Sequence, residues 1–246
     1  MTLTFARLLA DAWTLFRREA DLLVRVAGPF LFLPAFALLL LTDPLPVWPG
    51  RGADEAALAD WFRAVEAWMG GNAHWHLLAA ATSIYGQAVI ATALLGPPQP
   101  LGDAMRTAAR RYGRFLLAGA LVQLAFGLGF LAFILPGLIL YARFIAVVPV
   151  VVRERVSAVG ALGRSVAVTR GTTLAVLGAL AMLWVIQWFA ILPLAPLAAW
   201  LRQPGHANPL AIALVEAGVA AASAGHALGV LLVGIAVYRR LASRGT

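Results

Sequence analysis

The chain has 246 residues, of which 62% are hydrophobic and only 12% are charged, and its mean hydropathy is +0.86. A soluble globular domain is about 45–50% apolar and about 25% charged. The sequence contains no cysteine, which excludes thiol chemistry and a disulfide-stapled secreted domain. We therefore predict an all-α polytopic membrane protein, because this length accommodates about six spans of roughly 20 residues but no ordinary soluble domain beside them.

Hydropathy places the predicted spans in chain order. Single spans are expected at about residues 22–42, 75–95, 173–192 and 217–238, and an apolar run over 115–152 is long enough for two. Pro29 and Pro34 predict a kink in the first span, because proline removes a backbone hydrogen bond. The sequence Leu135-Pro136-Gly137 predicts the tight turn of a hairpin within the long run.

The N-terminus and the segment between the first two spans are also informative. No small-residue cleavage site follows the charged N-terminus, so we expect the first span to be retained rather than removed as a signal peptide. Within the polar segment 43–74, apolar residues recur at helical spacing from Leu58 to Trp68. This pattern predicts a separate amphipathic helix that lies on the membrane.

The basic residues, all arginine, predict the orientation in the membrane. Fifteen of the 19 lie in four segments, up to residue 25, in 101–114, in 153–172 and from 239 onward. The opposite side holds three, Arg51, Arg63 and Arg202, and Arg143 lies within the fourth span. The positive-inside rule then gives a cytoplasmic N-terminus and a cytoplasmic C-terminus. Because this asymmetry explains the basic charge, we expect no nucleic-acid partner.

A weak internal similarity suggests three pseudo-repeats within one membrane domain, 1–246. Residues 101–107 align with residues 159–165, and each cytoplasmic segment has the pattern of a short amphipathic helix that leads into a span. The units would be 1–95, 96–155 and 156–246, each an interfacial helix and two spans. The alternative is that amphipathic helices built from few residue types simply look alike. Repeats of this sense are parallel, so they lack the inverted symmetry typical of many transporters.

Several segments resemble a known family. They are 134–144, 148–154, 161–165, 169–171 and the ending 237–241. The chain resembles the glycerophosphoryl diester phosphodiesterase membrane-domain family and related uncharacterised six-span bacterial inner-membrane proteins. The resemblance implies this architecture and a bacterial inner-membrane location. The catalytic barrel that accompanies the membrane part in the named enzymes has no counterpart in this sequence, so no hydrolase activity is implied.

Four polar side chains within or near the spans are the candidate intramembrane site: Arg143, Gln187, Glu216 and His226. A charged side chain inside a span costs at least about 2.5–3.5 kcal/mol, so its presence needs a reason. An Arg143–Glu216 pair assisted by Gln187 would form either a substrate or headgroup site, or a polar cluster that locks helices together. His226 would be a proton relay or an interhelical hydrogen-bonding group, with Gln87, Gln123, Tyr85 and Tyr141 as candidate partners.

The cytoplasmic arginines are candidate contacts for anionic lipid headgroups. We assign this role to Arg106, Arg110, Arg111, Arg114, Arg153, Arg155, Arg164 and Arg170. His74 and His76 have the wrong spacing for two metal ligands on one helical face, so we expect no metal and no cofactor.

The sequence therefore favours a non-catalytic inner-membrane protein that engages anionic lipids or a membrane-protein partner. No catalytic triad order, cysteine nucleophile or phosphate-binding loop is present in it. The alternative is a small-solute or lipid transporter that uses the intramembrane polar layer.

Overall fold

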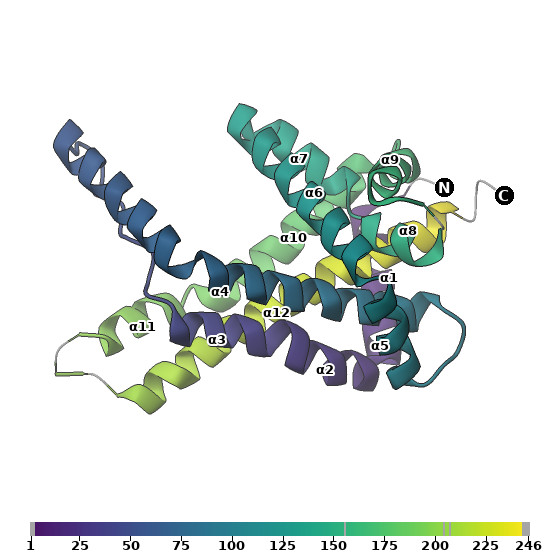
Figure 1. The fold of residues 1–246 in the computed structure, drawn as a ribbon, viewed down its shortest axis with the longest axis horizontal. Helices are drawn as coiled ribbons and strands as arrows, with labels where there is room; N and C mark the ends of the chain where they lie inside the picture. The colour runs from purple at the N-terminus through teal and green to yellow at the C-terminus, as the bar shows by residue number, and fades with distance from the viewer. Residues whose placement is uncertain (1–2, 155, 204, 207, 243–246) are drawn as a thin grey trace.

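A computed structural model describes residues 3–154, 156–203, 205–206 and 208–242 (Figure 1). This part of the chain contains helices and no strands. The helices are α1 Phe5–Arg18, α2 Ala20–Ala27, the π-helix η1 Gly28–Phe32, α3 Leu33–Leu41, α4 Glu55–Leu95, α5 Leu101–Arg110, α6 Tyr112–Ala132, α7 Ile134–Arg143, α8 Val147–Arg153, α9 Ala158–Val168, α10 Thr173–Ile191, α11 Leu194–Leu201 and α12 Pro209–Ala242.

Six helical runs in the described residues are long and apolar enough to cross a membrane, which confirms the six predicted spans. They are Ala20–Leu41, Glu55–Leu95, Tyr112–Ala132, Ile134–Arg153, Thr173–Leu201 and Pro209–Leu241. The short helix α1 crosses α10 and α12 at the end of the bundle where both termini lie (Figure 1). Because α1, α5 and α9 each precede two spans, the helix order has the form of the three proposed units, whose repetition in sequence stays a prediction.

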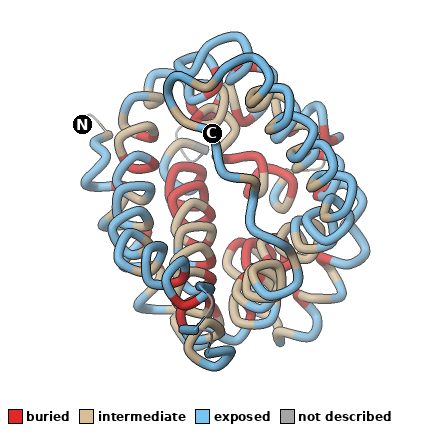
Figure 2. Tube along the Cα trace, turned by 90° about the vertical axis from the view of Figure 1, so that its left-hand side faces the viewer, coloured by how far each residue is buried: buried red, intermediate tan, exposed pale blue. Residues whose placement is uncertain are grey.

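Helix α12 lies at the centre of the packing. Every residue from 231 to 238 is buried, and Figure 2 shows the buried segments gathered inside the bundle. The outer helices leave large apolar side chains exposed, such as Trp184, Trp188 and Phe189 of α10. A soluble monomer rarely exposes so large an apolar surface, whereas the hydrocarbon of a bilayer favours it.

Span one is interrupted where the prolines predict a kink. The five-residue π-helix η1 contains Pro29 and joins α2 to α3, which has Pro34 in its first turn. A Cβ atom on Gly86 of α4 would lie 2.4 Å from the Cβ of Phe30, so only glycine allows α4 to approach this segment so closely.

The amphipathic helix predicted within 43–74 is not a separate element. It forms one continuous helix with span two, α4, whose 41 residues extend roughly 60 Å at about 1.5 Å per residue. The described chain has no proline between Glu55 and Leu95, so nothing forces a break. Figure 1 shows the start of α4 projecting beyond its neighbours. The indole N–H groups of Trp61 and Trp68 donate to the carbonyls of Pro46 and Asp43, which ties the preceding segment to this projection.

The hairpin between spans three and four turns at a different residue from the predicted one. The helices are separated by Phe133 alone, whose backbone is extended (φ −166°, ψ 151°). Pro136 lies in the first turn of α7, where proline is tolerated because the missing N–H has no partner in that turn. Span four itself is broken at residues 144–146, between α7 and α8, and the sequence analysis did not predict this break.

Candidate functional site

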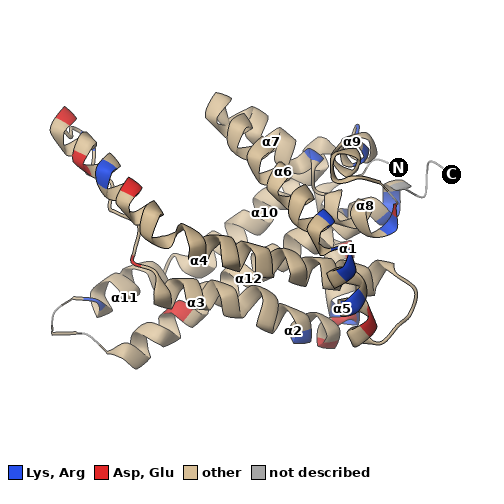
Figure 3. Cartoon of the chain, in the orientation of Figure 1, with Lys and Arg blue, Asp and Glu red and all other residues tan. Residues whose placement is uncertain are grey.

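Most arginines gather at one end of the bundle, the end that carries α1, α5 and both termini, which we call the basic end (Figure 3). This clustering is the asymmetry from which the sequence predicts a cytoplasmic face. The arginines of the basic end divide into those that bind other parts of the protein and those that do not.

Three arginines donate hydrogen bonds to carbonyl groups near the ends of helices. The guanidinium of Arg153 donates to the carbonyl of Leu95 (2.9 Å), and that of Arg239 donates to the carbonyl of Leu94 (2.7 Å), both at the end of α4. Arg111 donates to a carbonyl near the end of α8, that of Val152 (3.2 Å). The last carbonyls of a helix lack intrahelical partners and carry partial negative charge, so arginine both satisfies and neutralises them. These residues are structural ties.

Two carboxylates bind further arginines at the same end. Glu154 accepts hydrogen bonds from Arg164 (3.1 and 3.2 Å) and from the hydroxyl of Tyr238 (3.1 Å), which joins α9 and α12 just after α8. Arg240 of α12 pairs with Asp11 of α1 and holds the crossing helix against the bundle.

Five exposed arginine side chains at the basic end have no hydrogen-bonding or ionic partner among the described residues: Arg7, Arg17, Arg110, Arg114 and Arg170. Of the eight arginines assigned to lipid, only Arg110, Arg114 and Arg170 are therefore wholly available. Arg111, Arg153 and Arg164 bind the protein, Arg106 lies 3.5 Å from Asp103, and Arg155 lies outside the described residues.

The predicted Arg143–Glu216 pair is not formed. Buried Glu216 pairs instead with Arg202, which follows α11, at 2.6 Å. The backbone carbonyl of Arg143, at the end of α7, accepts hydrogen bonds from Ser165 (2.7 Å) and Thr169 (3.3 Å) of the α9 segment. Arg143 therefore lies beside α9 and not beside the start of α12, and hydropathy does not predict which helices are neighbours.

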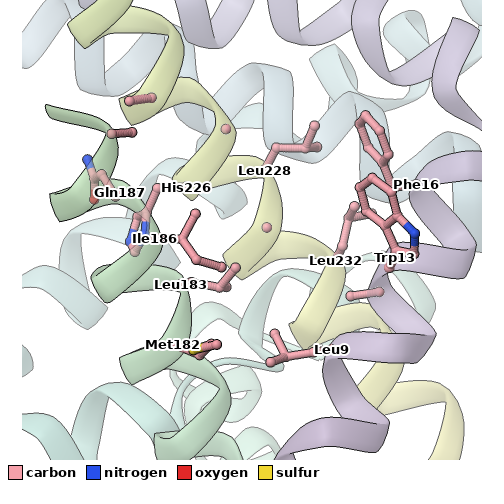
Figure 4. Close-up of a pocket in the computed structure, with 15 residues that line it drawn as sticks. Leu9, Trp13, Phe16, Met182, Leu183, Ile186, Gln187, His226, Leu228 and Leu232 are labelled. Atoms are coloured by element: carbon pink, nitrogen blue, oxygen red, sulfur yellow. The ribbon is translucent and has the colours of Figure 1, made fainter.

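Gln187 and His226, by contrast, come together. They line one side of a cavity of about 510 Å³ between α1, α10 and α12, opposite Trp13 and Phe16 (Figure 4). Gln187 donates to the hydroxyl of Ser223 (3.4 Å). The Nδ1 atom of His226 is buried without a partner. The remaining lining is apolar, so this cavity offers a ligand little beyond hydrophobic contact.

The side chains expected to assist His226 lie elsewhere. Gln87, Gln123 and Tyr141 line a second cavity, between α4, α6, α7 and α12, together with Ser83. Tyr85 donates to the carbonyl of Met105 in α5 (3.0 Å). The sequence analysis identified Gln87, Gln123 and Tyr141 as polar residues within the spans, but it did not predict that their helices are neighbours.

Helices, exposed apolar faces and six spans define an all-α multi-pass membrane protein. Comparisons with protein families, with curated proteins and with solved structures find no match to this chain. Within the described residues no three histidine, aspartate or glutamate side chains are grouped so that they could hold a metal ion.

Proposed function

We propose that this chain is a non-catalytic protein of the bacterial inner membrane that binds anionic lipid headgroups through the exposed arginines of its basic end. The observation that carries the proposal is the absence of protein partners for Arg110, Arg114 and Arg170 among the described residues, although carboxylates and helix ends nearby bind other arginines. Exposed guanidinium groups beside a bilayer attract lipid phosphates, with about 1 kcal/mol per residue near the surface.

The arrangement of the short helices supports the same function. Helix α1 buries Leu8, Ala12 and Leu15 on one face and exposes Arg7 and Arg17. Helix α5 likewise buries Ala104 and Ala108 and exposes Arg110. An amphipathic helix packed across the ends of spans holds its basic side chains at headgroup level. The family resemblance adds support for an inner-membrane location.

The transporter alternative has less support from the geometry. Its polar layer required Arg143, Gln187, Glu216 and His226 in one site, but Glu216 pairs with Arg202 and Arg143 lines neither described cavity. Only Gln187 and His226 share a cavity.

A lipid titration of matched double variants tests the proposal. Detergent-purified protein is titrated with short-chain phosphatidylglycerol or phosphatidylcholine, and the unfolding temperature is recorded. We expect phosphatidylglycerol to stabilise the wild type, and Arg110→Gln/Arg114→Gln to raise the half-saturating concentration by roughly fivefold per residue removed. Arg51→Gln/Arg63→Gln removes two arginines at the opposite end and should leave the curve unchanged. Equal curves for all three proteins, or equal stabilisation by phosphatidylcholine, would contradict headgroup binding.

A further inference from the structure

The second cavity differs chemically from the rest of the bundle interior. It has a volume of about 290 Å³ and is lined by Ser83 and Gln87 of α4, Gln123 of α6 and Tyr141 of α7, among apolar side chains. No charged residue and no histidine lines it. Its wall includes Phe144 and Ile145, so the cavity lies at the point where span four is broken.

The polar groups of this cavity lie deep within the spans. Gln87 precedes the end of α4 at Leu95 by eight residues, which is about 12 Å along a helix. Gln123 follows the start of α6 at Tyr112 by eleven residues, about 17 Å. Since the hydrocarbon core of a bilayer is about 30 Å thick, both side chains lie where water is normally absent.

Several of these groups lack the hydrogen bonds that such a depth demands. Gln87 donates to the Ser83 hydroxyl at 3.3 Å. The Tyr141 hydroxyl and the Gln123 carboxamide have no hydrogen-bonding partner among the described residues. An unsatisfied polar group in hydrocarbon costs several kcal/mol, so a partner from outside the chain would stabilise the folded protein. Gln123 is exposed, which gives such a partner access along α6.

We propose that this cavity is a hydrated binding site for a small neutral molecule that carries hydroxyl groups. A hydroxyl both donates and accepts, which matches the Tyr141 hydroxyl and the two ends of each carboxamide. A charged ligand would find no opposite charge in the lining and would pay the full desolvation cost. Broken spans that line an internal cavity are typical of solute sites in membrane proteins. The hydroxyl belongs either to a free polyol or to the glycerol of a lipid.

The chain contains no cysteine, so a single introduced thiol reports hydration of the cavity. Ser83→Cys places the thiol in the cavity, and Leu124→Cys places one on α6 beside Gln123, at a side chain that is 60% exposed on the bundle surface. Only the thiolate reacts, and it forms only where water is present. In reconstituted protein we expect 2-hydroxyethyl methanethiosulfonate to modify Ser83→Cys at least tenfold faster than Leu124→Cys. Equal or slower modification of Ser83→Cys would show a dry cavity and overturn the proposal.

Protection from labelling then tests binding and identifies the source of the hydroxyl. Slower modification of Ser83→Cys in the presence of glycerol would indicate a free polyol, and slower modification in the presence of dioctanoylglycerol would indicate a lipid. We expect one of the two compounds to lower the modification rate at least threefold. Adding Tyr141→Phe, which keeps the ring that contacts Phe126 at 5.3 Å, should abolish protection while fast labelling and the unfolding temperature persist. Absence of protection by either compound, or full protection without the Tyr141 hydroxyl, would overturn the site. The arginine variants of the basic end should not change these rates, so this test fails or succeeds independently of headgroup binding.

Discussion

The guanidinium of Arg153 donates a hydrogen bond to the backbone carbonyl of Leu95, the last residue of α4, across 2.9 Å and 58 residues of sequence. Arg239 binds the neighbouring carbonyl of Leu94. Two arginines from different spans thus close the end of the longest helix. The arginine excess of the basic end is therefore partly structural, and only the side chains without such ties are free to meet lipid.

Arg153→Ala should destabilise the protein, because it leaves a carbonyl at the end of α4 without its charged partner. We expect a loss of about 1.5–3 kcal/mol, the usual range for a hydrogen bond that involves a charged group. Arg110→Ala is the matched control, since Arg110 is exposed and has no partner among the described residues. Unfolding temperatures in detergent measure both. If the two variants have the same unfolding temperature, Arg153 is not a structural tie.

Gly234→Ala should disturb the break in span four. An added Cβ would lie 2.3 Å from the carbonyl oxygen of Ile145, so the backbone of one element must shift. We expect a destabilisation of about 1–3 kcal/mol, as for other overpacked interiors. Gly225→Ala in the same helix meets nothing within 4 Å and should be neutral or slightly stabilising. Unfolding temperatures again decide, and a stable Gly234→Ala would mean that α12 does not pack against this break.

The spans themselves could be predicted from the sequence, because a bilayer demands about 20 apolar residues wherever a helix crosses it. The breaks could be predicted only in part. Pro29 and Pro34 correctly predicted where the helix of span one is interrupted. Pro136 was wrongly taken to mark the hairpin turn, because proline also fits the first turn of a helix. The break at residues 144–146 has a local cause that the hydropathy pattern did not reveal: Pro149, in the first turn of α8, cannot donate to the carbonyl of Ile145 four residues before it. Ser165 and Gly234 contact the broken segment.

Arg202→Ala should be more damaging than the exposure of Arg202 suggests, because it leaves buried Glu216 without its partner. Its side chain is 37% exposed and that of Glu216 is 5% exposed, so the cost falls on the carboxylate. We expect a loss of about 1–3 kcal/mol after allowance for solvent at the arginine. The double variant Arg202→Ala/Glu216→Gln, which removes the buried charge as well, should recover part of it. Comparing the unfolding temperatures of the two variants tests this, and a double variant less stable than the single one would contradict the pairing.

The candidate site was predictable in its residue types but not in its pairings. Gln187 and His226 were both named as members of one polar layer and do share a cavity, but Gln187 was expected to assist Arg143 and Glu216 and not His226. Glu216 could not be assigned to Arg202, because Pro193 does not end span five as expected: α11 continues the span to Leu201 and packs against the start of α12. The same limit applies to the two cavities. Which glutamines line one cavity depends on which helices are neighbours, and the periodicity of the sequence does not show that.

The most direct test of headgroup binding is native mass spectrometry of the detergent-purified protein, which counts the lipids that remain bound. Wild type is compared with Arg110→Gln/Arg114→Gln/Arg170→Gln and with Arg51→Gln/Arg63→Gln, after exposure to an equimolar mixture of phosphatidylglycerol and phosphatidylcholine. The account predicts that wild type and the Arg51/Arg63 variant retain phosphatidylglycerol in preference to phosphatidylcholine. The triple variant, which keeps Arg7 and Arg17, should retain less phosphatidylglycerol than wild type while staying folded. A folded triple variant that keeps the same phosphatidylglycerol count as wild type would contradict it.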